Sequence, residues 1–436
     1  MTIRRGTVLV APAIALFAVV VSPAAAGSRT LIVDDDKQQC PNAAFTSINA
    51  AITAAAPGDQ IRVCPGLYSE VVIVDKPGLS LRGSTNGSTT EPCLRGDDAS
   101  NPARDTVING AVQLEANNVL LEAFTVQGAP IPPEVFWPAG ISTGFEFSGY
   151  VITRNVVQNN PTGINLKSNG VEPTVVTQNC IRSNNIATES ALPLGIVSEQ
   201  GLLVNARIES NTFTGHEFGS MFLGYGLVAF PVITAPNTDL TVTHNVSVND
   251  GVSGITVSNV ARVEISHNKL TRTGNGIQVF PPASDAVVLH NQVEESPFTG
   301  IRIDGNPFGC CFFPSGPTNV TVAHNHVAAA GTSAPQDGIA VRRSRSITVV
   351  DNLVERNTRD GISVRDSTDN VVSRNQADDN VRDGIRSRGT TSATTFEGNH
   401  MRRNAEHDAH DENRAANTWV GNHCETDFPP GTICGQ

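Results

Sequence analysis

The sequence predicts an all-β chain folded as one parallel β-solenoid with about 23 residues per coil. An asparagine recurs between Leu240 and Met401, with gaps of 23, 23, 34, 27, 23 and 24 residues. A Gly-Ile pair follows each of the first six asparagines, and a β-branched run precedes them. This period suits three short strands and three bends, whereas a helical hairpin repeat needs more than about 30 residues. The repeated residues are Asn245, Asn268, Asn291, Asn325, Asn352, Asn375 and Asn399.

The asparagines are expected to be structural. Asn tolerates the left-handed backbone that a tight bend needs, and stacked amides can hydrogen-bond along the axis of the solenoid. A second column follows five residues later, and we expect it to play the same part. It consists of Asn160, Asn184, Asn357, Asn380 and Asn404.

The chain begins with the features of a secretory signal peptide. Arg4 and Arg5 give a positive start, an apolar stretch runs from Thr7 to Val21, and three alanines end at Ala26. We expect residues 1–26 to be removed and the mature chain to be secreted. No second apolar run of about 20 residues occurs, so no membrane span is predicted.

Residues 27–75 are predicted to hold a capping helix and the first coil. An apolar stripe with helical spacing lies between Ser47 and Ala55, and Pro57-Gly58 ends it. Such a helix would cover the open apolar end of the first coil. Residues 76–400 are predicted to form the repeats, and residues 401–436 a C-terminal cap, because the Gly-Ile pattern fails after Met401.

The formal net charge of −12 argues against a nucleic-acid partner, since phosphate binding needs a basic face. We expect a monomer. The acidic triplet Asp34-Asp35-Asp36 is compatible with either a calcium site or, more simply, a solvated turn.

Eight cysteines in an exported chain indicate disulfides rather than metal ligands, and no CxxC spacing occurs. Cys40 with Cys64, and Cys424 with Cys434, would close the two ends of the solenoid. The sequence leaves open the partners of Cys93, Cys180, Cys310 and Cys311.

The run from Ile48 through Pro57-Gly58-Asp59 and Pro65-Gly66-Leu67-Tyr68 to Val74 resembles the entry of secreted right-handed parallel β-helix proteins. The later coils resemble the repeats of the same pectin-lyase-like superfamily, including its NosD-like group. Together the two resemblances cover most of residues 31–423. They imply a right-handed parallel β-helix whose surface hosts lyases, hydrolases, epimerases or no chemistry at all.

The outward positions of the Gly-Ile strands carry the candidate binding residues. Arg342, Arg365 and Arg388 are spaced by 23 residues and form one column. A parallel column precedes the glycines in the same coils, and it consists of Asp337, Asp360 and Asp383. Either the two columns form an exposed salt-bridge ladder, or the arginines grip the carboxylates of an acidic polymer such as a uronate chain.

A catalytic centre is predicted at Arg302 and Asp304, where a cation could neutralise a uronate carboxylate beside a base for β-elimination. Trp137 and Phe312 lie on interrupting loops and could stack on sugar rings, although loop aromatics often pack on the wall instead. A lyase-like activity would be compatible with Ca²⁺ as cofactor.

A column of histidines stands just before the turn asparagines, and stacking at the bend is the favoured interpretation over a metal site. It consists of His244, His267, His290 and His324. The leading hypothesis is therefore a secreted protein that binds or processes an acidic polysaccharide. The alternatives are a non-catalytic surface solenoid and a NosD-like copper-handling accessory protein.

Overall fold

The computed structural model describes residues 28–85, 90–96, 100–131, 138–186, 192–199, 202–225, 236–306 and 316–434. The expected signal peptide, Trp137, Cys310, Cys311 and Phe312 lie outside these ranges. No helix among the described residues is long and apolar enough to cross a membrane.

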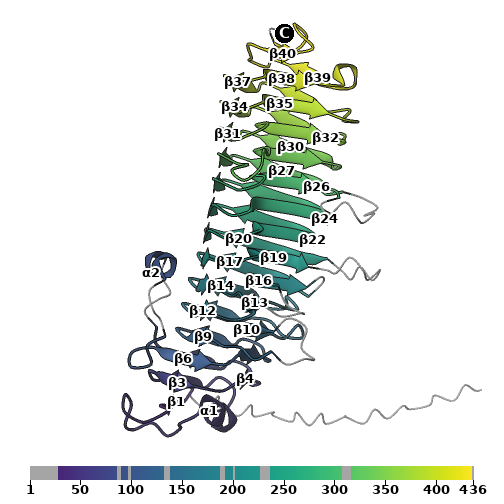
Figure 1. The fold of residues 1–436 in the computed structure, drawn as a ribbon. Coiled ribbons are helices and arrows are strands. Elements are labelled where there is room, and N and C mark those ends of the chain that lie inside the picture. The colour runs from purple at the N-terminus through teal and green to yellow at the C-terminus, as the bar shows by residue number, and fades with distance from the viewer. Residues whose placement is uncertain are drawn as a thin grey trace, which may run out of the picture.

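The described chain winds into an elongated stack of coils, which confirms the predicted parallel β-helix (Figure 1). Each coil contributes strands to three faces, which we name after the repeated motifs. The Gly-Ile sheet contains β4(Val72–Val74), β7(Val112–Leu114), β10(Ala139–Thr143), β13(Thr162–Asn165), β16(Leu194–Glu199), β19(Gly219–Tyr225), β26(Ile301–Asp304), β29(Ile339–Arg342), β32(Ile362–Arg365), β35(Asp383–Arg388), β38(His407–Asp411) and β40(Asp427–Phe428).

The pre-Asn sheet leads into the turn asparagines and contains β1(Thr30–Val33), β2(Gln60–Val63), β5(Ser80–Arg82), β8(Leu120–Glu122), β11(Val151–Thr153), β14(Thr174–Thr177), β17(Val204–Glu209), β20(Asn237–Thr243), β27(Thr318–Ala323), β30(Arg345–Val350), β33(Val371–Ser373), β36(Thr395–Glu397) and β39(Thr418–Val420). Two long strands, β22(Ser253–Ser266) and β24(Asn275–Leu289), continue from the Gly-Ile sheet onto this face and join the two sheets.

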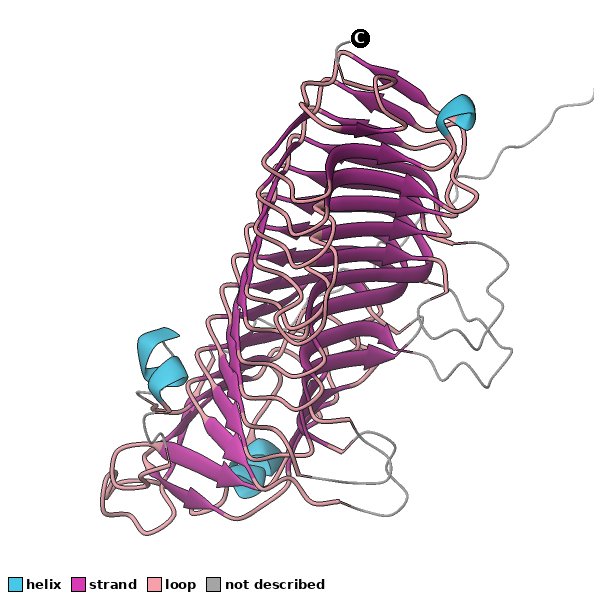
Figure 2. Ribbon diagram, turned by 45° about the horizontal axis from the view of Figure 1, so that its top comes forward, coloured by secondary structure: helices cyan, strands magenta, loops and turns pink. Residues whose placement is uncertain are grey.

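The post-Asn sheet contains β3(Gly66–Tyr68), β6(Thr106–Asn109), β9(Thr125–Gln127), β12(Val156–Gln158), β15(Cys180–Arg182), β18(Thr212–Thr214), β21(Val246–Val248), β23(Lys269–Thr271), β25(Gln292–Glu294), β28(His326–Ala328), β31(Leu353–Glu355), β34(Gln376–Asp378) and β37(His400–Arg402). Figure 2 shows the strands of all faces running across the long axis, with loops at their ends.

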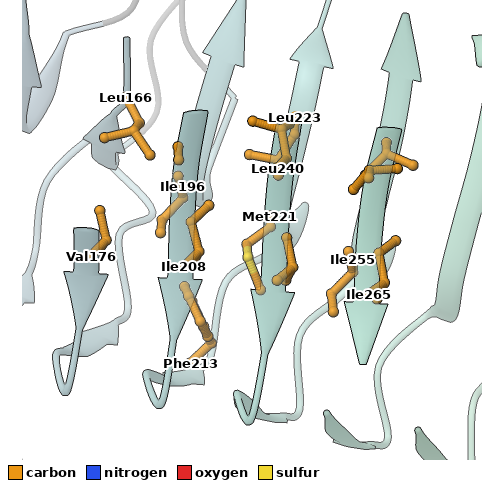
Figure 3. Close-up of a cluster of buried hydrophobic side chains, with 14 of the residues drawn as sticks. Leu166, Val176, Ile196, Ile208, Phe213, Met221, Leu223, Leu240, Ile255 and Ile265 are labelled. Carbon is orange, nitrogen blue, oxygen red and sulfur yellow. The ribbon is translucent and has the colours of Figure 1, made fainter. Parts of the chain in front are cut away.

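The core lies inside the coil, where inward side chains from successive coils stack on one another (Figure 3). The register places the isoleucines of the Gly-Ile pairs in one column, and all are fully buried. The glycine before each isoleucine is required by close packing: a Cβ on Gly361 would lie 2.6 Å from the amide nitrogen of Asn380.

Two amide ladders run along the axis, as predicted. In the first, Asn245 Nδ2 donates to Asn268 Oδ1, and Asn268 Nδ2 donates to Asn291 Oδ1, both at 3.0 Å. In the second, Asn357 Nδ2 donates to Asn380 Oδ1 at 2.9 Å. These amides are buried, so the ladder satisfies polar groups that water cannot reach.

The prediction that the asparagines adopt the left-handed backbone is wrong. The residue before each asparagine does so: φ is 56° at His244 and 55° at His267. The corner is made one residue earlier, which leaves the asparagine free to point its amide inward toward the neighbouring coils.

The helix α1(Ile48–Ala54) forms where the sequence predicts it, and the hydroxyl of Ser47 accepts a hydrogen bond from Ala50 N at 3.3 Å. Its side chains Ile48, Ala51 and Ile52 are buried in the main core at the first coil. A second helix, α2(Thr90–Arg95), lies against β15 and β18 of the post-Asn sheet.

Three disulfides link the described chain. Cys40–Cys64 and Cys424–Cys434 are the predicted pairs, and Cys93–Cys180 answers one question that the sequence leaves open. The last of these joins α2 to β15, a contact between residues 87 apart that no spacing rule indicates.

The coil pattern continues beyond residue 401, within the segment predicted as a cap. In β38, Ala409 occupies the place of the usual isoleucine and aligns with Ile385. Asn422 extends the first ladder by accepting a hydrogen bond from Asn399 Nδ2 at 2.9 Å. The chain then closes with η1(Arg414–Ala416) between β38 and β39, and with the disulfide at Cys424.

Candidate functional site

The Gly-Ile sheet carries a dense group of charged side chains on its last coils, near the C-terminal end of the solenoid (Figure 1). We call it the arginine cluster. It comprises Arg342, Arg359, Arg382, Arg386 and Arg388, together with Asp337, Asp360 and Asp383.

The strand register explains why the arginines meet. Asp304, Arg342, Arg365 and Arg388 follow one another in a single outward column of β26, β29, β32 and β35. In the neighbouring column, Ala340 and Ser363 are small and fully buried. Long side chains beside these two residues can therefore fold over them instead of extending into solvent.

The three aspartates are fully buried, so the interpretation as an exposed ladder is wrong. They precede the glycines at the start of each strand, where the chain turns into the sheet. Each carboxylate must therefore be compensated within the protein, because an unpaired buried charge is strongly destabilising.

The ion pairs cross from coil to coil. Arg342 Nη2 lies 3.0 Å from Asp337 Oδ2 in its own coil, whereas Arg388 Nη2 reaches the same oxygen at 3.8 Å from two coils away. Arg382 binds Asp360 of the preceding coil through its Nε and Nη2 atoms. The five arginine side chains are mostly shielded, with exposed fractions of 15–22%.

The cluster contains more arginines than carboxylates to neutralise them. Five guanidinium groups face the three aspartates and Glu412, whose Oε1 lies 2.7 Å from Arg386 Nη2. The buried Nε atoms of Arg342, Arg386 and Arg388 have no hydrogen-bond partner. Arg359 Nε lies 3.0 Å from Asp337 Oδ1 without the alignment of a hydrogen bond, so these two attract only as charges.

Burial and then the charge of Arg359 lower the pKa of Arg388 to about 10, against the opposing attraction of Asp337 and Asp360. Arg388 therefore stays charged at neutral pH in a largely buried position where Arg359 repels it. Burial raises the pKa of Asp360, and Asp337 adds to this, against the hydrogen bonds from Arg382. A bound anion would offset the repulsion between Arg388 and Arg359.

Two histidines border the cluster on β38. His407 Nδ1 lies 3.1 Å from Asp383 Oδ1, and His410 Nδ1 lies 3.3 Å from Asp383 Oδ2. Burial acts to raise the pKa of Asp383, but the contacts with His410 and His407 and the charge of Arg386 outweigh it and lower that pKa. His407 is hydrogen-bonded to this carboxylate, whereas His410 Nδ1 approaches it without the alignment of a hydrogen bond. His410 is thus an imidazole beside a buried carboxylate and an arginine, which is an arrangement suited to a general base.

The environment of Asp304 argues against its predicted catalytic role. Its carboxylate is fully buried and accepts hydrogen bonds from Arg302 at 2.6 Å, Arg343 at 2.6 Å and the backbone of Asn306 at 3.0 Å. Because both carboxylate oxygens already accept these hydrogen bonds, neither can take a proton from a substrate. Arg302 and Asp304 instead anchor the chain at the end of β26.

Arg365 departs from the predicted column in another way. Its side chain is 46% exposed and pairs with Asp366 at 3.0 Å, at the edge of the arginine cluster. The predicted aromatic partners Trp137 and Phe312 lie outside the described residues.

The histidine column is a stack, with ring centroids 5.0 Å apart from His244 to His267 and from His290 to His324. These rings spread along the axis, one per coil, instead of converging on one point as metal ligands do. The acidic triplet is also engaged internally: Asp34 accepts from Cys40 N, and Asp35 accepts from Leu67 N at 2.9 Å.

A buried His-Asp pair interrupts the second amide ladder. His216 Nδ1 lies 2.8 Å from Asp250 Oδ1, and Oδ2 of the same aspartate accepts hydrogen bonds from Ser220 and Ser247. All four side chains are buried, and both serines bind the carboxylate rather than the imidazole. The group therefore lacks the arrangement of a nucleophilic triad, and its hydrogen bonds serve to satisfy the buried polar side chains at the turn.

A family model described as "Right handed beta helix region" matches residues 145–293 and 282–424, which include the whole arginine cluster. The chain belongs to this family. The pectin-lyase-like fold implied by the sequence resemblance is thereby confirmed. No curated protein matches this β-helix chain.

Two solved structures illustrate the likeness of this β-helix to known enzymes. One is a mannuronic acid specific polysaccharide family 6 lyase from human gut microbiota, with 12% identity, coverage of 85% of this chain and 87% of that one, and a TM-score of 0.55. The other is the DFA-IIIase of Arthrobacter chlorophenolicus A6 without its lid, in complex with GF2, with 14% identity, coverage of 90% and 98%, and a TM-score of 0.54. At such identities the likeness concerns the fold.

Sequence reasoning identified Arg342, Arg388 and the three aspartates, missed Arg359 and Arg382, and did not assign Arg386 or His410 to the site. Arg359 and Arg382 each precede an Asp-Gly-Ile motif directly, so their repetition in two consecutive coils was a usable signal. His410 had no such signal, because its coil lacks the Gly-Ile pair.

Proposed function

We propose that this β-helix is a secreted protein that binds an acidic polysaccharide at the arginine cluster and cleaves it by β-elimination. The observation that carries the proposal is the surplus of cationic side chains in the arginine cluster, where five arginines face four carboxylates. Guanidinium groups bind carboxylates through paired hydrogen bonds, which are among the stronger polar contacts in proteins.

The solenoid geometry favours a polymer over a small anion. Adjacent coils are about 4.8 Å apart along the axis, as neighbouring strands of any sheet are. Arginines on β29, β35 and the turn before β32 therefore offer donors at successive levels, and a chain with a carboxylate on each residue could engage several of them. Three disulfides support the secreted location, since such bonds persist in oxidising compartments.

The elimination step would use the edge of the cluster at β38. A uronate carboxylate paired with Arg386 loses negative charge, which acidifies the proton on C5. His410 would take that proton, the electron pair would form the C4–C5 double bond, and the C4–O bond would break, with the departing oxygen protonated from water. Asp383 would hold the imidazole and stabilise its charged form.

Calcium does not fit this site. The carboxylates that could ligate it are each bound to arginine, and the surroundings carry excess positive charge. Arginine, and not a metal ion, would therefore neutralise the substrate carboxylate.

Binding is tested by calorimetric titration with oligomannuronate, oligoguluronate and oligogalacturonate. Replacing Arg388 by Gln should weaken binding of the recognised oligomer about tenfold or more, since a lost charged hydrogen bond costs ~1.5–3 kcal/mol. Arg374→Gln is the matched control, because Arg374 is 63% exposed on the pre-Asn face and pairs with Asp351. Equal affinity of the two variants, or no binding of any uronate, would overturn the binding proposal.

Cleavage is tested separately by the ultraviolet absorbance of the new double bond. Wild-type protein should produce it from the oligomer that binds, and His410→Gln should abolish it while retaining affinity. Binding without any product would refute the elimination step and identify a non-catalytic glycan-binding solenoid.

A further inference from the structure

A hollow lies on the same Gly-Ile sheet, on the early coils, far from the arginine cluster. It has a volume of about 350 Å³, within the range of small-molecule sites. Its floor is formed by the outward residues Gln113, Ser142 and Asn165, which the register places side by side on β7, β10 and β13. The strands β16, β19, β22, β24 and β26 separate it from β29 of the arginine cluster (Figure 1).

The wall of this hollow is held in place by buried hydrogen bonds. The loop after β10 carries Phe145 and Phe147, which line the hollow. The hydroxyl of the fully buried Tyr150 donates to this loop at Gly144 O or to the adjacent Leu114 O, both at 3.0 Å. On the other side, Thr143 Oγ1 accepts from Lys167 N at 2.6 Å, which ties β10 to the end of β13.

An unused polar atom points to a ligand. Asn165 is only 4% exposed, it lines the hollow, and its Oδ1 has no hydrogen-bond partner. A buried amide oxygen without a donor is costly, and native proteins rarely keep one without a use. A ligand hydroxyl in the hollow would supply the missing donor.

The charge of the hollow excludes the ligand proposed for the arginine cluster. Lys167, the only cation among the described residues that line it, is neutralised by Glu199 at 2.9 Å. Glu115 and Glu146 are exposed at the rim and pair with no cation among the described residues. The site is therefore net negative and would repel a uronate, whereas carboxylate and amide oxygens accept hydrogen bonds from sugar hydroxyls.

We infer that this hollow is a binding subsite for an uncharged sugar residue of a glycan. Asn165, Gln113 and Ser142 would hydrogen-bond the ring hydroxyls, while Phe145, which is 53% exposed, would offer its face to the apolar side of the ring. This assignment is independent of the function proposed above. If both hold, one glycan reaching both sites would place neutral residues on the early coils and acidic residues on the late coils.

The test is calorimetric titration of the full chain with neutral hexasaccharides of glucose, mannose, xylose and fructose. One of them should bind, and Phe145→Ala should weaken it about tenfold, a loss of ~1.4 kcal/mol. Phe298→Ala is the matched control, since Phe298 is another partly exposed turn phenylalanine, 38% exposed on a later coil. Arg388→Gln should leave this binding unchanged, so the two sites can fail separately.

Asn165→Ala provides a second variant that removes the unpaired oxygen without introducing a buried charge. It should weaken binding of the neutral sugar several-fold, because the ligand hydroxyl loses its acceptor, while leaving the unfolding midpoint within the range of Phe298→Ala. No binding of any neutral hexasaccharide would overturn the inference. So would binding that is insensitive to Phe145→Ala, or a uronate whose binding Phe145→Ala abolishes.

Discussion

Replacing Asn291 by Ala should destabilise the protein by about 3 kcal/mol or more. Asn291 Oδ1 accepts from both N and Nδ2 of Asn268, and its Nδ2 donates to Ile265 O at 2.8 Å, Leu289 O at 3.1 Å and Asn325 Oδ1 at 3.0 Å. The substitution leaves the buried Asn268 N–H without its acceptor, at a cost of ~1–3 kcal/mol. The groups that lose the other four hydrogen bonds each keep another partner, so each of these lost bonds costs ~0.5–1.5 kcal/mol.

The measurement is urea denaturation of the wild type, Asn291→Ala and a control, Gln292→Ala. Gln292 carries the same amide one residue later but faces outward and is half-buried, so its loss should stay within about 0.5 kcal/mol. Native-state hydrogen exchange should locate the weakening at the coils of β23, β25 and β28. If Asn291→Ala falls within 1 kcal/mol of its control, the buried ladder is not what holds the coils in register.

Three further outcomes follow from other parts of the molecule. Asp250→Ala should cost about 3–5 kcal/mol in urea denaturation, because it removes the acceptor of His216, Ser220 and Ser247, which are all buried; a loss below 1 kcal/mol would contradict this. Replacing Cys93 and Cys180 together by Ser should lower stability by about 2–4 kcal/mol and expose α2 to limited proteolysis; unchanged cleavage of α2 would count against it. Hydrogen bonds from Ala56 N and Arg29 N lower the pKa of Asp59 from 3.8 to about 2. Its contribution is complete above pH 4 and is lost as the pH falls through 2, so Asp59→Asn should flatten the acid limb of the unfolding curve.

The repeat made most of the fold predictable, because every coil needs the same residue types at the same places. Gly361 allows close packing, Ile362 fills the core and Asn375 continues the amide ladder, and the sequence repeats this pattern in many coils. The start of α1 was equally readable from Ser47 and its apolar stripe. Where a coil lacks the Gly-Ile pair, as at Ala409, the pattern predicted a cap, although the strand there still pairs in register with the preceding coil.

The candidate site was less predictable because its character depends on burial. The sequence shows that Asp337 and Arg342 recur with the repeat, but not that the aspartate is fully buried and the arginine side chain only 17% exposed. Nor does it show that Arg388 reaches back two coils to Asp337. No sequence motif marks the hollow at Asn165, since its floor forms only where Gln113, Ser142 and Asn165 from three coils lie side by side.

The direction of the amide ladder has a consequence for how such a protein can change in evolution. Each asparagine donates to the asparagine of the following coil, from Asn155 to Asn422, so every coil presents the same acceptor to the coil before it and the same donor to the one after it. A gene duplication that copies one whole coil therefore inserts a unit whose two surfaces already match its neighbours. An insertion of any other length breaks the ladder unless the flanking asparagines still meet, as they do across the 34-residue interval between Asn291 and Asn325. The surface between the two sites can thus lengthen only in whole coils, while the loops remain free to vary.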